Sequence, residues 1–385
     1  SNGFYSQTGI NLAVFDLAPT KFISAEIGGN LNTSGGFLWN YDGETPVENG
    51  FLVYPDAISL NPDAAGGAIA AGDYWYVATY EWMDANGNIN RSAPSVPVKT
   101  TTTGATSKVT VTVPTLRLTY KTANKVKIVI YRYSTAQPIY YQVTSVSIPL
   151  LNTQSAPTVS FDDKLADASI SGNNILYTTG GIVENIGAPA TDNVALYKSR
   201  LFLVDAEDRN LLWYSKQVIQ NTPVEMSDLF TIYVAPTTAA QGNTGPITAL
   251  SALDDKLIIF KRNAIYYITG NGPDNTGANN DFSEPVFITG TVGCSNQSSI
   301  VFMPNGLMFQ SDKGIWLLGR DLSTSYIGSP VEAFNSDTVL SALNIPGTNE
   351  VRFTLESGTT LMFDYFQGQW GTFTGIPGVF SCLYE

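Results

Sequence analysis

Histidine is absent from this 385-residue sequence. Its absence excludes Ser-His-Asp and Cys-His catalysis, zinc sites with imidazole ligands and histidine-based pH switches. Cysteine is nearly absent as well, since the chain has only Cys294 and Cys382. Two cysteines are too few for a disulfide framework. They either form one pair or remain two separate buried thiols, and the second interpretation is favoured.

Charged residues are scarce, at 14% of the chain, and they give a formal net charge of −13. A field of that sign repels phosphate, which argues against general nucleic-acid binding. No apolar run approaches the roughly 18 residues of a membrane-spanning helix, so no membrane anchor is expected. No signal-peptide pattern opens the chain. Because it starts at Ser and stops within the apolar run "GVFSCLYE", we expect a processed or truncated piece.

What is present is typical of a β-rich protein. Thr, Ser, Asn, Gly and Tyr are abundant, which suits strands with a polar but uncharged surface. The apolar runs are short and are separated by polar turns. Two stretches, "SDTVLSAL" and "DKLADA", predict no more than a turn or two of helix.

One hairpin pattern is written four times, as an apolar run, a polar turn and a second apolar run. The copies are "SRLFLVDAEDRNLLWYSK", "KLIIFKRNAIYYI", "GLMFQSDKGIWLLG" and "EVRFTLESGTTLMFDY". Their first strands start near Leu201, Leu257, Leu307 and Val351, so the unit recurs roughly every 40–55 residues. Further apolar stretches before and after each hairpin, such as "ITALSAL" and "EPVFITG", supply more strands. Three to four short strands per period predict the blades of a β-propeller.

The N-terminal stretch Lys21–Pro46 adds another unit, so a propeller of about five or six blades is expected. Residues 64–165 break the pattern. There "DYWYVATYEWMDANGNINRSAPS", "SKVTVTV", "NKVKIVIYRYS" and "PIYYQVTSVSI" alternate apolar and polar residues, which predicts an antiparallel sandwich with one buried face per sheet. The sequence thus predicts three parts. Residues 1–63 begin the propeller, 64–165 form an inserted fibronectin type III/immunoglobulin-like (Fn3/Ig-like) sandwich, and 166–385 supply the remaining blades.

Several motifs invite a chemical interpretation. "SDKGIW" is close to an Asp-box turn, but it lacks two features of that motif, so Asp312 and Gly314 are interpreted as turn formers. "DANGNIN" places Asp84, Asn86 and Asn88 at alternate positions, as in a calcium loop. An EF-hand loop would need Gly and Glu where Ile89 and Ser95 stand, so a plain β-turn is favoured.

Acidic residues gather in several places. The polar loop Gly270–Phe282 carries Asp274 and Asp281 and could hold a cation or contact a partner, although a solvated loop is the favoured interpretation. Other carboxylates are Asp205, Glu207, Asp208, Asp254, Asp255, Asp162 and Asp163. A glycosidase needs two carboxyl groups facing each other across a sugar, whereas adjacent acids usually form turns. No catalytic residue, cofactor or metal site is predicted, and the protein is not expected to be an enzyme.

Aromatic residues are plentiful, with 6 Trp, 20 Tyr and 19 Phe. Most lie within apolar runs and are expected to pack in the core: Trp213, Tyr266, Tyr267 and Trp316. The segments "FLWNYDG" and "YFQGQWGTF" flank Gly-rich turns, so they are the better candidates for exposed aromatic side chains that stack on glycans.

Three segments carry a resemblance to a known family. They are Gly35–Asp56, Ile175–Lys216 ("ILYTTGGIVENIGAPATDNVALYKSRLFLVDAEDRNLLWYSK") and Ile247–Pro273. They resemble the propeller-containing tail nozzle, or packaged-DNA stabilisation, proteins of short-tailed bacteriophages. The Fn3-like segment also fits, because phage tail proteins often carry such modules.

That resemblance implies a structural virion protein. It implies a homo-oligomeric ring, with six copies expected, assembled in the bacterial host cytoplasm and attached below the portal and adaptor among other tail proteins. Phage DNA would pass through the lumen without sequence-specific binding, and an acidic wall suits such a conduit. The main alternative is a glycan- or receptor-binding propeller adhesin, and a glycoside hydrolase is a less favoured third interpretation.

Overall fold

The computed structural model describes residues 22–122, 125–219, 222–235, 242–375 and 377–383, and the backbone of strands β1 (Asn2–Tyr5) and β2 (Leu12–Phe15). Its regular structure is almost entirely antiparallel β-sheet. It also contains the short helix α1 (Asp167–Ile170) and the 3-10 helices η3 (Gln297–Ser299), η4 (Ser329–Phe334) and η5 (Pro346–Thr348). The predicted all-β class is confirmed.

Five sheets contain four strands each, and in every one the strands pair in chain order. Sheet 1 contains β3 (Ser24–Ile27), β4 (Asn30–Thr33), β5 (Trp39–Tyr41) and β6 (Pro46–Glu48). Sheet 2 contains β15 (Thr191–Tyr197), β16 (Arg200–Asp205), β17 (Leu211–Tyr214) and β18 (Thr231–Tyr233). Sheet 3 contains β19 (Ile247–Leu253), β20 (Lys256–Lys261), β21 (Ile265–Thr269) and β22 (Val286–Thr289). Sheet 4 contains β23 (Val301–Met303), β24 (Gly306–Ser311), β25 (Gly314–Gly319) and β26 (Thr324–Tyr326). Sheet 5 contains β27 (Val339–Ile345), β28 (Glu350–Leu355), β29 (Thr360–Asp364) and β30 (Gln369–Phe373).

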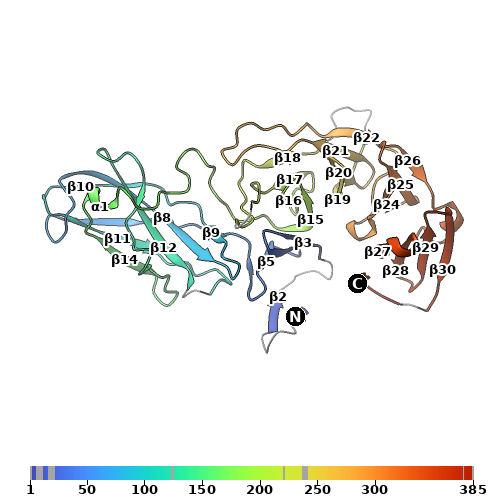
Figure 1. Ribbon diagram of the computed structural model, residues 1–385, viewed down its shortest axis with the longest axis horizontal. Helices are drawn as coiled ribbons and strands as arrows, with labels where there is room; N and C mark the ends of the chain where they lie inside the picture. The colour runs from blue at the N-terminus through green and yellow to red at the C-terminus, as the bar shows by residue number, and fades with distance from the viewer. Residues whose placement is uncertain are drawn as a thin grey trace.

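The repeated hairpins of the sequence form the second and third strands of sheets 2 to 5. The apolar stretches before them form the first strands, so "SDTVLSAL" contributes to β27 rather than to a helix. The five sheets follow one another along an arc, and sheets 1 and 5 lie at its two ends (Figure 1). First strands contact each other between neighbouring sheets, as β3 does with β15, β15 with β19, and β23 with β27. The first strand of each sheet therefore lies on the inner side of the arc.

A separate apolar cluster fills each space between consecutive sheets, and strand β20 shows why. Leu257 and Ile259 pack toward sheet 2, whereas Ile258 and Phe260 pack toward sheet 4. Because both faces of this strand are buried, its sequence "LIIF" is a continuous apolar run rather than an alternating one. Strand β16 ("LFLV") follows the same rule, with alternate residues directed to sheets 1 and 3.

The end sheets follow a different rule. In β28, Val351, Phe353 and Leu355 join the cluster shared with sheet 4, whereas the intervening Arg352 pairs with Glu350. Strand β4 ("NLNT") is likewise mostly polar. Among the described residues no apolar cluster joins sheet 1 to sheet 5. The alternating strands thus mark the ends of the arc.

Between sheets 1 and 2 the chain forms a sandwich of two sheets. One has the order β10 (Val98–Thr102), β8 (Gly72–Met83), β12 (Lys127–Ser134) and β13 (Tyr141–Gln142), with β9 (Ile89–Arg91) also paired to β8. The other has the order β14 (Thr158–Asp163), β11 (Lys108–Pro114) and β7 (Ser59–Asp63). Alternate residues of both sheets share one core, in which Tyr76 and Tyr80 of β8 meet Val109 and Val111 of β11. Strand β7 pairs with β11, so this unit begins within the residues that the sequence assigned to the propeller.

One predicted strand of the sandwich is mostly wrong. The stretch "PIYYQVTSVSI" forms a strand only at Tyr141–Gln142. Pairing to β12 ends where Val143 N–H donates to Ile130 and resumes where Ile128 N–H donates to Leu150. The residues between these bonds leave the sheet, and Val146 and Ile148 are exposed by 67% and 81%. The alternation of apolar and polar residues predicts a strand, but it does not show whether that strand pairs with β12 along its whole length.

Candidate functional site

The contacts that fix the sandwich to the arc form a network of polar side chains. We call this region the joint. It consists of the turn Asp84–Asn88 and the residues 91–92 and 119–121 of the sandwich, with their partners in sheets 1 and 2 and in residues 175–190. Its polar side chains are largely buried, so each hydrogen bond made there matters to stability.

Asp84 lies at the centre of the first contact. The turn between β8 and β9 inserts it against sheet 1, where it is 4% exposed. Its carboxylate accepts from Asn30 Nδ2 of β4 at 2.8 Å, from Asn88 Nδ2 at 2.9 Å, and from the backbone N–H groups of Asn86 at 3.0 Å and Asn88 at 2.8 Å. Four donors, one of them from the neighbouring sheet, therefore hold this buried anion in place.

The rest of the turn extends the same network. Asn86 Nδ2 donates to the Gly29 carbonyl at 2.9 Å and to Asn30 Oδ1 at 2.7 Å. Asp42, in the turn between β5 and β6 of sheet 1, likewise accepts from the Ala85 N–H at 2.9 Å, whereas Asn30 of sheet 1 donates to Asp84 in the opposite direction. The sandwich and sheet 1 thus exchange hydrogen bonds in both directions across this contact.

The predicted β-turn at "DANGNIN" is confirmed, since the Gly87 N–H donates to the Asp84 carbonyl. A calcium loop presents its carboxylate and amide oxygens to the ion. Here the Asp84 oxygens accept from N–H groups. Within the described ranges no group of three or more Asp, Glu or Cys side chains is placed to hold a metal. What the sequence did not reveal is that the turn packs on Asn30, 54 residues away.

A buried ion pair forms the second contact. Lys121 Nζ lies 3.0 Å from Glu48 Oε1 and donates to the carbonyls of Glu48 at 2.8 Å and Gly50 at 2.5 Å. Glu48 also accepts from the Thr119 hydroxyl at 2.5 Å and the Tyr120 N–H at 2.9 Å. Burial lowers the pKa of Lys121, and the nearby Glu48 carboxylate opposes that change.

The third contact connects the sandwich to sheet 2 through residues 175–190. The Tyr177 hydroxyl donates to the Ser92 carbonyl at 3.1 Å and accepts from the Asn185 N–H at 2.9 Å. Asn185 in turn donates to the Arg91 carbonyl at 3.1 Å and accepts from buried Lys216 Nζ at 2.5 Å. With three separate contacts, the sandwich is held against both sheets rather than joined by a single flexible linker.

The candidate carboxylates are distributed over sheet 2, sheet 3 and the sandwich, where they serve local structure. Asp205 accepts from the N–H groups of Glu207 and Asp208 and from Trp213 Nε1, which is the turn role that the sequence favoured. In sheet 3, Asp254 pairs with Arg320 and Asp255 pairs with Lys256. In the sandwich, Asp162 pairs with Lys108 and Lys164, and buried Asp163 pairs with Arg132.

The loop Gly270–Phe282 is also organised by its own acids. Asp274 accepts from the Thr276 N–H and hydroxyl and from Asn279 Nδ2, and Asp281 accepts from the N–H groups of Asn271 and Gly272. These hydrogen bonds hold the pKa of both carboxyls below its ordinary value. The loop is also fixed to sheet 2, because the buried Arg200 guanidinium donates to the Asn271 carbonyl at 3.0 Å.

The expected exposure of aromatic residues is partly wrong. In "FLWNYDG", Trp39 is 1% exposed, because it packs between Phe37 and Tyr120. In "YFQGQWGTF", Phe366 is 82% exposed as expected, whereas Trp370 packs on Phe363. The residues expected in strand interiors are buried or half-buried: Trp213, Tyr266, Tyr267 and Trp316. In the "SDKGIW" turn, Gly314 takes a positive φ of 96°, and Asp312 pairs with Arg262 of sheet 3.

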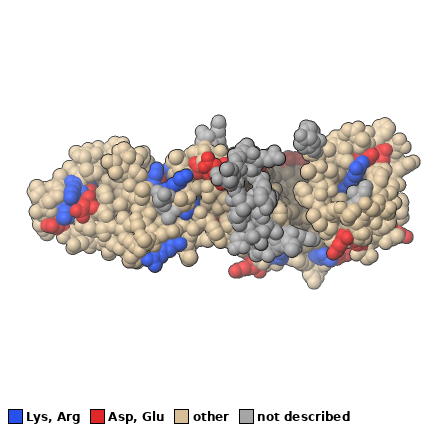
Figure 2. Space-filling model, turned by 90° about the horizontal axis from the view of Figure 1, so that it is seen from below, with Lys and Arg blue, Asp and Glu red and all other residues tan. Residues whose placement is uncertain are grey.

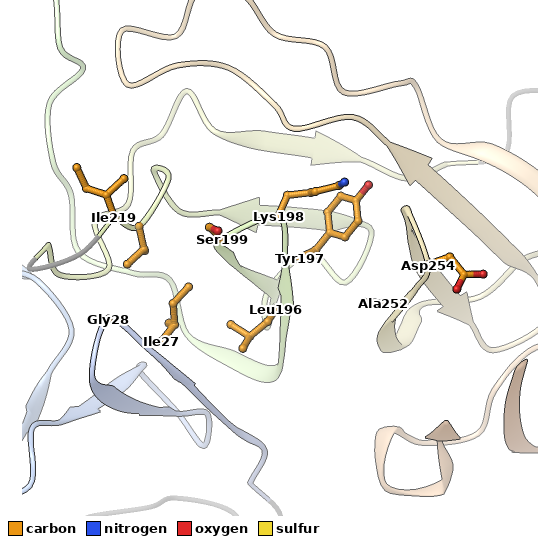
Figure 3. A pocket seen from close by; sticks show the side chains of 10 residues that line it. Ile27, Gly28, Leu196, Tyr197, Lys198, Ser199, Ile219, Ala252 and Asp254 are labelled. Carbon is orange, nitrogen blue, oxygen red and sulfur yellow. The ribbon is translucent and has the colours of Figure 1, made fainter. Parts of the chain in front are cut away.

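A cleft opens where the turns between first and second strands of sheets 1, 2 and 3 meet. Figure 3 shows Ile27 and Gly28, the turn residues Lys198 and Ser199, and Asp254 around it. Lys198 and Ser199 both have a positive φ, 49° and 57°, which is rare for residues other than glycine. Asp254 is already paired with Arg320, so this cleft has no free pair of acids.

Charges on the surface are sparse. Figure 2 shows small separate groups of acidic and basic side chains, with uncharged residues over most of the described surface between them. Five cations of the described chain are buried: Lys121, Arg132, Arg200, Lys216 and Lys261. Figure 2 therefore gives no sign of a broad basic patch on the face that it shows.

The two cysteines do not pair. Cys294 is fully buried, which raises the pKa of its thiol to about 11, whereas Cys382 is exposed. The expectation of two buried thiols is thus wrong for Cys382, which lies beyond the last sheet. A thiol reagent such as dithionitrobenzoate should label one cysteine rapidly in the native protein and the second only after unfolding. Rapid labelling of both, or of neither, would contradict this arrangement.

Lys261 makes the free energy of unfolding depend on pH. Burial lowers the pKa of Lys261 from 10.5 to about 8, and its ammonium donates to Asn210 Oδ1 and the Val234 carbonyl, both uncharged. Between these two pH values the unfolded chain binds more protons than the folded one, so stability rises with pH. The free energy of unfolding of the wild type relative to Lys261→Met should therefore increase from pH 8 to pH 10. Parallel pH profiles for the two proteins would contradict the prediction.

Among the described residues no helix is long and apolar enough to cross a membrane. No family model and no curated protein matches the chain. Among solved structures, the chain is similar to BamB from Moraxella catarrhalis at 9% identity, covering 98% of this chain and 88% of that one, with a TM-score of 0.31. Apo AztD from Citrobacter koseri is 13% identical over 91% and 81% of the two chains, with a TM-score of 0.29. A chain of the mitotic checkpoint complex is 10% identical over 70% and 78%, with a TM-score of 0.31. These similarities are too low to carry an argument, so the description of the fold rests on the strand pairings.

Proposed function

We propose that this chain is a structural, non-enzymatic protein of a short-tailed bacteriophage virion, a tail nozzle subunit that forms a ring around the DNA exit channel. In this account the copies, expected to number six, lie below the portal and adaptor. They assemble in the host cytoplasm and let DNA pass without sequence-specific contacts. The family assignment within this proposal comes from the resemblance of residues 35–56, 175–216 and 247–273.

The observation that carries the structural role is the joint. A ring subunit must present fixed surfaces to its neighbours, so a sandwich that swung freely on a linker would be unsuitable. Asp84, Lys121 and Tyr177 instead connect the sandwich to sheets 1 and 2 through buried hydrogen bonds. Exposed apolar side chains on the sandwich, such as Leu118 and Ile148 at 74% and 81%, offer contact area for a neighbour.

The same proposal interprets the five four-stranded sheets as blades of a β-propeller. Support comes from their meander order, from the inner position of the first strands, and from the apolar cluster between each consecutive pair. The absence of such a cluster between sheets 1 and 5 in the described residues leaves room for a further unit, within the range of five or six that the sequence predicted.

We interpret the sandwich as an Fn3/Ig-like module. In an immunoglobulin sandwich, strands B and E pair in one sheet, and C, F and G lie in the other. Strands β7, β8, β11, β12 and β13 take the places of B, C, E, F and G in chain order, since β7 pairs with β11 and β12 lies between β8 and β13. Strand β14 occupies the place of D beside β11, although it comes last in the chain.

A second candidate, a glycan- or receptor-binding adhesin, is favoured by one observation. Phe366 is 82% exposed at the tip of the β29–β30 turn, with Phe373 also exposed at the end of β30. Exposed aromatic rings suit stacking on sugars or on a receptor. An adhesin of this kind does not need to form a ring.

Native mass spectrometry over a range of concentrations separates the two candidates. The nozzle proposal predicts closed multiples of the 41.5 kDa chain, with six copies as the largest stable species. A monomer at every concentration would contradict ring formation by the chain itself and favour the adhesin.

A further inference from the structure

A second hollow, of about 360 Å³, lies at the other end of the sheets from the cleft in Figure 3. The cleft is bordered by turns that join first and second strands, whereas this hollow is bordered by turns that join second and third strands, β20–β21 and β24–β25. In a meander these two kinds of turn lie at opposite ends of the sheet. The loops leading into β23 and β27 complete its wall, so sheets 3, 4 and 5 all contribute.

The lining of the hollow is entirely polar. It comes from residues 262, 295–296, 310–312 and 335–338, and every one of these is polar or charged. A pocket for an apolar ligand would expose carbon-rich walls, which are absent from this lining. The hollow therefore suits a ligand that forms many hydrogen bonds.

The charges around the hollow argue for a neutral ligand. Arg262 Nε lies 2.8 Å from Asp312 Oδ2, and Arg262 Nη2 lies 2.6 Å from Asp312 Oδ1, so both groups are used in a two-point ion pair. Asp337 accepts from the Ser357 N–H at 3.2 Å. The guanidinium disfavours a metal cation, and the two carboxylates disfavour an anion.

Several groups of the hollow have unused hydrogen-bonding capacity. Asn296 Oδ1 is buried and has no hydrogen-bond partner among the described residues. The hydroxyls of Ser336 and Thr338 likewise make no hydrogen bond within the part of the chain that the structure describes. An amide oxygen accepts, and a hydroxyl both donates and accepts, so this set matches a ligand with several hydroxyl groups.

An aromatic surface adjoins the hollow. Asn335 Nδ2, on the lining, donates to the Tyr326 hydroxyl at 3.2 Å. Tyr326 packs on Trp316 with 5.4 Å between ring centroids, and it is 37% exposed. Sugars present C–H faces as well as hydroxyl groups, so an aromatic ring beside a polar hollow provides for both.

We propose that this hollow is a binding site for a neutral sugar, with Asn296, Asn335, Ser336 and Thr338 as hydrogen-bonding groups and Tyr326 as the stacking surface. The site lies within one chain, so the inference does not depend on ring formation. It assigns a sugar-binding surface to the end of the strands opposite the Lys198 turn, in sheets 3 to 5.

The test is a titration of the full chain with sugars, in which saturation-transfer NMR detects binding. The four probes are methyl α-glucoside, methyl β-galactoside, N-acetylglucosamine and rhamnose. Wild type is expected to bind at least one of them. Ser336→Trp fills the hollow from its exposed rim, so it should weaken that binding by about tenfold or more, the equivalent of about 1.4 kcal/mol. Ser145→Trp, on the exposed surface of the sandwich, is the matched control and should bind as wild type does.

Unchanged melting temperatures of both Trp variants would show that the effect is local. Should Ser336→Trp fold poorly, Asn335→Ala replaces it, with an expected loss of about tenfold because one amide hydrogen bond is removed. Binding that persists in the variants of the hollow would overturn the proposal. So would the failure of wild type to bind any of the four probes.

Discussion

Lys121→Met is expected to lower the free energy of unfolding by about 3–5 kcal/mol, because it leaves the Glu48 carboxylate buried without its cation. The Met side chain is close in length to the Lys side chain, so the buried volume is largely kept. The Lys121 ammonium also lies over the rings of Phe51 and Trp82, at 4.9 and 5.6 Å from their centroids, and these cation–π contacts are removed. What is lost is the ammonium group, which bonds Glu48 and Gly50 of the strand and loop next to the sandwich. Denaturant unfolding of purified wild type and variant measures the difference.

Three further proteins make this test specific. Glu48→Gln gives the second single loss. In Glu48→Gln/Lys121→Met neither charge remains, so the loss of stability should be smaller than the sum of the two single losses by about 0.5–3 kcal/mol. Lys99→Met is the matched control, since Lys99 also pairs with an acid in the sandwich but is half-exposed. It should leave stability nearly unchanged, because solvent screens an exposed pair. Equal effects of Lys121→Met and Lys99→Met would contradict the role assigned to the joint.

Asp84→Ala is expected to cost about 3–5 kcal/mol as well, since the hydrogen bonds of a charged acceptor are lost and its donors remain buried. The backbone N–H groups of Asn86 and Asn88 lose their acceptor. The side-chain amides of Asn30 and Asn88 each lose one of two acceptors, since they also donate to Asn40 Oδ1 and to the Gly28 carbonyl. Because Asn30 belongs to sheet 1, the loss should also loosen the contact between the sandwich and the arc. Hydrogen–deuterium exchange of residues 28–32 and 84–88 should become faster than in wild type.

The control for Asp84 is an acid in an exposed turn. Asp321 accepts from the Ser323 N–H and hydroxyl, but it stays in solvent at the β25–β26 turn. Asp321→Ala should therefore change neither the stability nor the exchange of residues 28–32. If Asp84→Ala behaved in the same way, the turn would not contribute to fixing the sandwich to sheet 1.

The sequence was sufficient to predict the repeated sheets, for a physical reason. A strand buried on both faces must be a continuous apolar run, as "LIIF" in β20 is, and each run was followed by turn residues and a second run. The same logic identifies the end of the arc, because "VRFTL" in β28 alternates. The repeat of the hairpin does not by itself distinguish an end sheet from an inner one, whereas the change from a continuous to an alternating apolar run does.

The joint could not be predicted in the same way. "DANGN" is a strong turn signal, and a turn that packs on another sheet has the same local sequence as one in water. Its partner Asn30 is 54 residues away, so the pairing depends on the folded arrangement of two units. Buried Lys121 gave no signal either, because a lysine in a polar loop is usually exposed.

We propose that copies of this chain close into a ring, and negative-stain electron microscopy tests this directly. Images of the purified chain across a range of concentrations should show closed rings with a central hole. The native mass of these rings should equal that of about six chains. Isolated particles of single-chain size at every concentration would contradict the claim.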